Sequence, residues 1–120
     1  MIRGYVIAES IRPGSTLKGI PMTLTKVSRK AQLNASADQP RIWTLIEFET
    51  TAKAARLANA LAALLDDKPS VWYSDFNDGD EKFVVFPKRV FRYRRGDALA
   101  RRKAQSYAQS LGVPQLDWME

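Results

Sequence analysis

The pattern of hydrophobic and polar positions predicts strands through the first 48 residues. Apolar residues occupy both faces of positions 2–9. Positions 22–29 alternate in character, and strict alternation there points Leu24 and Val27 to opposite faces. Positions 41–48 show the clearest alternation, which is typical of a half-buried strand. The first part of the chain therefore reads as three strands.

Two later stretches repeat apolar residues at helical spacing. The first helix is expected to start at a threonine cap, Thr50 or Thr51, and to run to about Leu65. The second is expected to start at Gly96 or Asp97 and to end before a Gly-Val-Pro stop. Both helices carry one apolar stripe, so each should pack on a sheet.

Between the helices the sequence predicts a hairpin and a further short strand. Positions 70–76 and 81–86 flank an Asn-Asp-Gly-Asp turn, and 90–94 follows a second tight turn. The expected order is β-β-β-α-β-β-(β)-α. The fold class is thus α+β, with an antiparallel sheet of about five to six strands and two amphipathic helices on one face of the sheet. Residues 41–111 follow a partly ferredoxin-like order, which is a fold-level analogy.

The composition agrees with a single domain over residues 1–120 and excludes several kinds of side-chain chemistry. The chain is 45% hydrophobic and 27% charged, as in ordinary globular proteins. It has no cysteine and no histidine, so disulfide, thiolate and imidazole chemistry are excluded. The apolar N-terminal run is too short for a signal peptide, and the longest apolar stretch, 57–65, is too short for a membrane span. These features predict a cytoplasmic protein without a membrane partner.

Charge is distributed unevenly along the chain. Residues 1–81 hold ten basic and ten acidic side chains, whereas 82–120 hold nine basic and three acidic ones. The whole net charge of +6 therefore lies in the last third. Such an excess favours a polyanionic partner, for example a nucleic acid.

The basic residues of this last third are the candidate polyanion site. As a strand, 90–94 would place Arg92 and Arg94 on one face and Phe91 and Tyr93 on the other. The alternative is a solvated cationic surface with local ion pairs, since no RNP, KH, zinc-finger or helix-turn-helix pattern is present. The candidate residues are Lys88, Arg89, Arg92, Arg94, Arg95, Arg101, Arg102 and Lys103.

Several predicted strands are apolar on both faces, which leaves one sheet face to be covered. The N-terminal hairpin, the tail at Trp118, a second subunit or a bound ligand could cover it. The candidate interface or pocket residues are Trp43, Leu45, Trp72 and Tyr73. A homodimer through this face is one expectation.

Catalytic motifs are absent from the sequence. There is no nucleophile elbow, Walker A motif or dinucleotide fingerprint, and no cofactor or metal-ligand set. The acidic stretch 75–81 departs from the EF-hand spacing and reads as a hairpin turn. An enzyme would need Glu47, Glu49 or Asp75 to converge with a cation or a tyrosine.

Three functions follow, in order of preference. The first is a non-catalytic binding or interaction module that self-associates. The second is a nucleic-acid-binding protein that uses the basic 88–103 region. The third is a small-molecule enzyme that works without histidine or cysteine.

Overall fold

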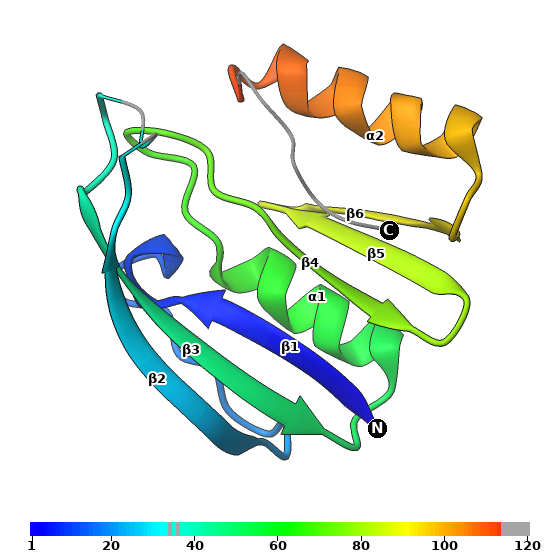
Figure 1. Cartoon of the computed structure of the whole chain (residues 1–120), viewed down its shortest axis with the longest axis horizontal. Helices are drawn as coiled ribbons and strands as arrows, with labels where there is room; N and C mark the ends of the chain where they lie inside the picture. Colours follow the sequence, from blue (N-terminus) through cyan, green and yellow to red (C-terminus); the bar gives the residue numbers. More distant parts are fainter. Residues whose placement is uncertain (34, 36, 114–120) are drawn as a thin grey trace.

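A computed structural model describes residues 1–33, 35 and 37–113 of the chain. The described part is an α+β domain, as predicted, with six strands, two α-helices and a short 3-10 helix (Figure 1). The elements are β1 (Ile2–Ile7), η1 (Ala8–Ser10), β2 (Thr23–Ala31), β3 (Ile42–Thr50), α1 (Ala54–Leu64), β4 (Ser74–Asp78), β5 (Glu81–Phe86), β6 (Arg89–Arg94) and α2 (Ala98–Ser110).

The strands form two antiparallel sheets instead of the single sheet that the sequence predicted. One has the order β1-β3-β2 and the other β4-β5-β6. β1 and β4 lie next to each other (Figure 1), but they are not paired by a backbone ladder. A side chain joins them instead, because the Ser74 hydroxyl donates to the Tyr5 carbonyl oxygen at 3.3 Å. Since β3 and β4 belong to different sheets, the ferredoxin-like order stays a prediction.

The two helices cover opposite faces of the β4-β5-β6 sheet, so the expectation that they share one face was wrong. Alternation along β5 produces this arrangement. Phe83 and Val85 pack in the same core as the leucines of α1. Val84 and Phe86 point the other way and pack with the alanines of α2. Figure 1 shows α1 behind β1 and β4.

The helix starts differ in how they are capped. Asp97 caps α2, as predicted, because its carboxylate accepts from the Ala100 N–H at 3.0 Å. The predicted threonine cap of α1 was wrong, since the N-cap residue is Lys53. The Thr50 hydroxyl is used elsewhere: it donates to the Pro21 carbonyl at 2.5 Å and accepts from the Ala52 N–H at 3.0 Å. Among the described residues, neither helix is long and apolar enough to cross a membrane.

Candidate functional site

The most exposed regular element of the structure is the edge strand β2. It pairs with β3 on one side, and within the described residues no strand pairs with its other side (Figure 1). Every residue of β2 is exposed except Ser28, which is half-buried. A free edge of nine residues presents unpaired N–H and C=O groups to another chain.

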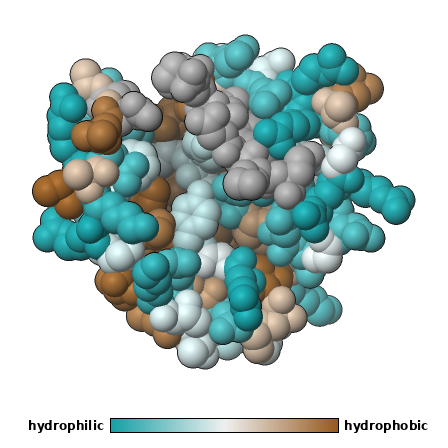
Figure 2. Space-filling model, viewed as in Figure 1, coloured by the Kyte–Doolittle hydropathy of each residue, from teal (hydrophilic) through white to brown (hydrophobic). Residues whose placement is uncertain are grey.

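This edge carries an apolar strip that the strand pairing brings together. Val27 is paired with Ile46, and Leu24 with Phe48, so these four side chains share one face. Leu24 is 60% exposed and Val27 59%, and Ile42, which lies further along β3 opposite Ala31, is 50% exposed. Figure 2 shows hydrophobic atoms along the margin where β2 and β3 lie. Such a strip beside a free strand edge is typical of an interaction surface.

Sequence reasoning missed the strip because it assumed unbroken alternation. A register shift between Leu24 and Lys26 inserts an extra residue, Thr25, into β2. The shift turns Leu24 to the same face as Val27, whereas strict alternation placed them on opposite faces. The signal in the sequence was the spacing of three between two apolar residues in an otherwise polar strand.

The four residues predicted as an interface or pocket lie partly inside the domain. The Trp43 ring meets the Trp72 ring edge-on with centroids 5.0 Å apart, and Leu45 packs on the same core. Trp72 is only 5% exposed. Tyr73 packs against Phe86 at 5.9 Å on the α2 side. An intermolecular role for these residues stays a prediction, and Trp118 lies outside the described residues.

The structure places three of the eight predicted basic residues, Arg89, Arg92 and Arg94, on two different faces of β6. The ladder between β5 and β6 puts Arg92 and Arg94 on the face that α1 covers. Arg89 lies on the α2 face, where its guanidinium sits 4.7 Å from the ring centre of Phe91 and 5.2 Å from that of Tyr107. Cation–π contacts of this kind hold the guanidinium in place.

Some of these cations already have partners. Arg92 forms an ion pair with Glu81, in which Nη2 donates to Oε1 at 2.8 Å. Arg95 donates from Nη1 to the Gly79 carbonyl at 3.3 Å, and Arg101 is half-buried. Among the described residues, the basic side chains of the group that form no ion pair and are exposed are Lys88, Arg89, Arg94, Arg102 and Lys103.

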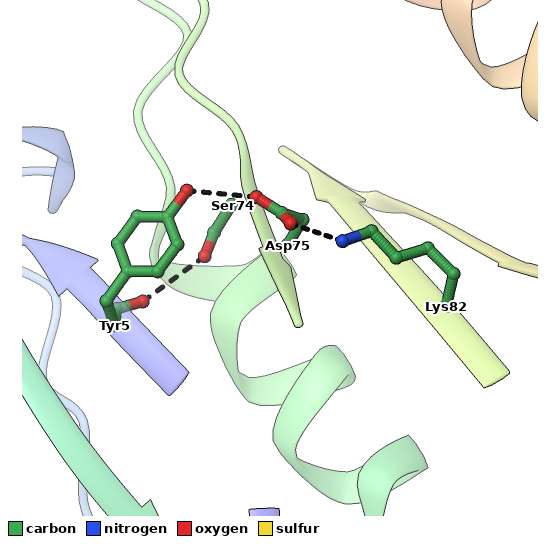
Figure 3. Close-up of polar contacts among 4 residues, drawn as sticks. All are labelled: Tyr5, Ser74, Asp75 and Lys82. Atoms are coloured by element: carbon green, nitrogen blue, oxygen red, sulfur yellow. Dashed lines mark hydrogen bonds and ion pairs between the residues drawn. The ribbon is translucent and has the colours of Figure 1, made fainter. Parts of the chain in front are cut away.

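A polar cluster connects the two sheets (Figure 3). Asp75 is the only member of this cluster that the sequence indicated as a candidate site residue. Lys82 donates from Nζ to Asp75 Oδ2 at 2.5 Å, and the Tyr5 hydroxyl donates to Asp75 Oδ1 at 3.0 Å. Lys82 is 1% exposed, so its ammonium group is buried with the carboxylate. The sequence could not show that β1 and β4 would be neighbours, although it contained all three residues.

The chemistry of this cluster favours a structural role over a catalytic one. Burial, followed by the charge of Asp75, raises the pKa of Tyr5 far above its ordinary value. Tyr5 therefore keeps its proton and acts as a donor instead of a base. The carboxylate in turn balances the Lys82 charge. Glu47 lies across the β1-β3 ladder from Tyr5 but forms an ion pair with Lys26, at 4.0 Å, and Glu49 forms one with Arg3, at 3.8 Å.

The raised pKa predicts a specific response to alkaline pH. The unfolded chain releases the Tyr5 proton near pH 10, while the folded chain keeps it, so stability falls as pH rises above about 10. We expect Tyr5→Phe to flatten the decline in unfolding free energy by up to about 1.4 kcal/mol per pH unit. Urea unfolding at pH 8 to 11 measures this. Equal slopes for the two proteins would show that Tyr5 is not the responsible group.

The acidic stretch 75–81 forms the β4-β5 hairpin, with Gly79 at φ +58° in its turn. In the described part of the chain, no group of three or more acidic side chains is placed to hold a metal ion.

Comparison with known proteins adds no function to these surfaces. No protein-family model matches the chain, and neither does a curated protein or a solved structure.

Proposed function

We propose that this protein is a non-catalytic interaction module that self-associates through the free edge of β2. The observation that supports this most is that Leu24 and Val27 are exposed side by side on one face of an unpaired strand edge. A second copy would supply the missing ladder partners and cover part of the strip. Main-chain hydrogen bonds then provide affinity, as in other strand additions.

The charges of β2 favour one way of pairing two copies. With a two-fold axis at Val27, Lys26 lies opposite Ser28 of the second copy. Because Thr25 is an extra residue in the strand, Arg29 then lies opposite Leu24 and Lys30 opposite Thr23, so no cation directly faces another. An axis at Lys26 would bring this residue opposite itself, and an axis at Ser28 would bring Lys26 opposite Lys30. Like charges directly opposite each other destabilise a ladder, which disfavours both alternatives.

The same axis also joins the apolar strips of the two copies. Residues that face each other across an antiparallel ladder point to one side of the sheet. Val27 would therefore contact Val27 of the second copy, with Ile46 behind each of them. The dimer would then have one continuous apolar face, made from the half-exposed apolar strips of the two copies. An acidic peptide or an unrelated strand that paired with β2 would not extend the apolar face in this way.

Sedimentation equilibrium of the native chain and of Val27→Lys tests the proposal. The native protein should approach twice the 13.6 kDa of one chain as concentration rises. Val27→Lys places two ammonium groups at the axis, and we expect it to raise the dissociation constant about 100-fold or more, since like charges at an interface cost several kcal/mol. Leu99→Lys is the matched control, because Leu99 is equally exposed, at 62%, but lies on α2.

Cross-linking then tests the register. The chain has no cysteine, so Val27→Cys introduces a single thiol. At the axis two Cα atoms lie about 4.5–5.5 Å apart, which a disulfide can span. Mild oxidation should yield a covalent dimer with Val27→Cys and not with Leu99→Cys. A native chain that remains a monomer at millimolar concentration would contradict the self-association itself, and a dimer that Val27→Cys does not cross-link would contradict this interface.

A further inference from the structure

The second sheet also ends in a free edge, at β6. This strand pairs with β5 on one side, and within the described residues no strand pairs with its other side (Figure 1). The helix α2 packs on a face of this sheet, where its buried alanines lie with Val84 and Phe86. The main chain of β6 is therefore open to another strand along this margin.

The pairing with β5 determines which backbone groups of β6 face the free edge. Consecutive residues of an antiparallel strand direct their N–H and C=O groups alternately to one neighbour and to the other. The Arg95 N–H donates to the Asp80 carbonyl at 2.7 Å, which places the backbone groups of Arg95 on the side of β5. By alternation, the backbone groups of Val90, Arg92 and Arg94 point to the free edge.

Most of these outward backbone groups have no partner within the described residues. The Arg94 carbonyl accepts from the Asp97 N–H at 3.0 Å, which agrees with a direction away from β5. No other hydrogen bond in the described part of the chain uses the groups that face this edge. The N–H groups of Val90, Arg92 and Arg94, and the carbonyls of Val90 and Arg92, are thus left for another chain.

Charge determines which kind of strand this edge accepts. Arg89, Arg92 and Arg94 are exposed along β6, and Glu81 of β5 forms an ion pair with Arg92. Neither Arg89 nor Arg94 forms an ion pair within the described residues. The strands β6 and β2 of a second copy do not suit this edge, because both are cationic and like charges across a ladder destabilise it. An acidic strand has the complementary charge.

The aromatic residues of β6 favour a peptide over a nucleic acid as the occupant. Tyr93 is 7% exposed, and the Phe91 ring contacts those of Phe86 and Tyr107 with centroids 5.8 and 5.3 Å apart. Single-stranded nucleic acids are normally held by bases that stack on open aromatic rings. An extended acidic peptide instead uses both features of this edge, the unpaired main-chain groups and the arginines.

We propose that the free edge of β6 binds an extended acidic segment of a partner protein as an added antiparallel strand. The ladder provides affinity and register, as in other strand additions. Because residues opposite each other point to the same face, acidic residues opposite Arg92 and Arg94 would meet them on one face, and an acidic residue opposite Arg89 would meet it on the other. A guanidinium offers a carboxylate two parallel donors.

A short peptide with the sequence Glu-Val-Glu-Val-Val-Glu tests the ladder by fluorescence polarisation. When it pairs antiparallel to β6, its glutamates lie opposite Arg94, Arg92 and Arg89. Methylation of the second glutamate nitrogen removes the N–H that would donate to the Arg92 carbonyl, whereas methylation of the next valine nitrogen removes one that faces away from β6. Both methylated peptides keep the full charge. We expect the first to bind at least about tenfold more weakly than the second, since it leaves the facing carbonyl without a donor.

Arg94→Glu tests the contribution of charge, and Arg102→Glu is its matched control, because Arg102 is equally an exposed arginine but lies on α2. We expect Arg94→Glu to weaken peptide binding at least about tenfold, as repulsion replaces attraction at one ladder position. Arg102→Glu should change it less than about threefold, because exposed charges at a distance are largely screened. The circular dichroism spectra of both variants should match that of the native chain.

Backbone amide NMR locates the peptide. The shifts should fall within 89–95 and not within 23–31, and Val27→Lys should bind the peptide as the native chain does, because β2 and β6 are edge strands of different sheets. The proposed dimer and this site can therefore fail independently. Equal binding of the two methylated peptides, equal losses in the two arginine variants, or shifts confined to β2 would overturn the proposal. A twelve-residue oligothymidylate that shifts the same amides and binds more tightly than the peptide would also overturn it, and would assign this edge to a nucleic acid.

Discussion

Asp75→Ala should lower the free energy of unfolding by about 3–5 kcal/mol, the usual effect of leaving one half of a buried ion pair without its partner. The carboxylate accepts from Lys82 Nζ at 2.5 Å and from the Tyr5 hydroxyl at 3.0 Å. Its removal leaves a buried ammonium group, 1% exposed, without a counter-charge. Domains of this kind have only about 5–15 kcal/mol of stability in total, so the variant should be close to unfolding. Urea denaturation followed by circular dichroism measures the change.

The double variant Asp75→Ala with Lys82→Met separates charge from packing. Replacing both members of a buried pair by apolar groups is often neutral or stabilising. We therefore expect the double variant to be more stable than Asp75→Ala alone, although the Tyr5 hydroxyl still loses its acceptor. A loss below about 1 kcal/mol in Asp75→Ala, the range of an exposed ion pair, would show that the cluster is accessible to water.

Phe86→Ala should lower the free energy of unfolding by a similar amount, about 3–5 kcal/mol, which is usual when a fully buried phenylalanine is truncated. Phe86 is completely buried, and its ring contacts those of Tyr73, Phe91 and Tyr107 with centroids 5.2–5.9 Å apart. The only fully buried side chains that α2 contributes are those of two alanines. The aromatic cluster around Phe86 must therefore supply most of the contact that holds α2 on the sheet.

Amide hydrogen exchange gives this prediction a local readout. In Phe86→Ala the amides of α2 should lose protection by a larger factor than those of α1, which packs on the opposite face of β5. Leu99→Ala is the control on the same helix. Leu99 is 62% exposed, so its truncation should change stability by less than about 0.5 kcal/mol. Uniform loss of protection in both helices would show that the domain opens as a single unit.

Local patterns were sufficient to predict the elements of the fold. The Asn-Asp-Gly-Asp sequence marks the β4-β5 turn, and Asp97 caps α2 as expected. Both signals act over a few residues, because turn and cap preferences arise from neighbouring backbone groups. The short range of these signals also explains why the predicted threonine cap of α1 was wrong. Thr50 has a suitable side chain, but Pro21, from a distant loop, takes its hydroxyl.

The features on which the proposals depend are long-range and could not be read from the sequence. The division into two sheets follows from how β1 meets β4, through Ser74 and Tyr5 and not through a ladder. The exposed strip on β2 depends on the extra residue Thr25, and the spacing of three between Leu24 and Val27 does not by itself show that a residue has been inserted. Which backbone groups of β6 face its free edge depends on its register against β5, and hence on residues outside the strand itself.

The position of β1 between β3 and β4 also bears on how the protein is made. β1 is synthesised before both of its neighbours, because its ladder partner lies in 42–50 and the adjacent strand β4 in 74–78. Until then Val6 and Ile7 stay exposed to solvent, although they are only 5% and 9% exposed in the finished domain. The β1-β3-β2 sheet can therefore be completed only after residue 50 has been synthesised, and in this interval capture of the growing chain by a chaperone competes with premature collapse.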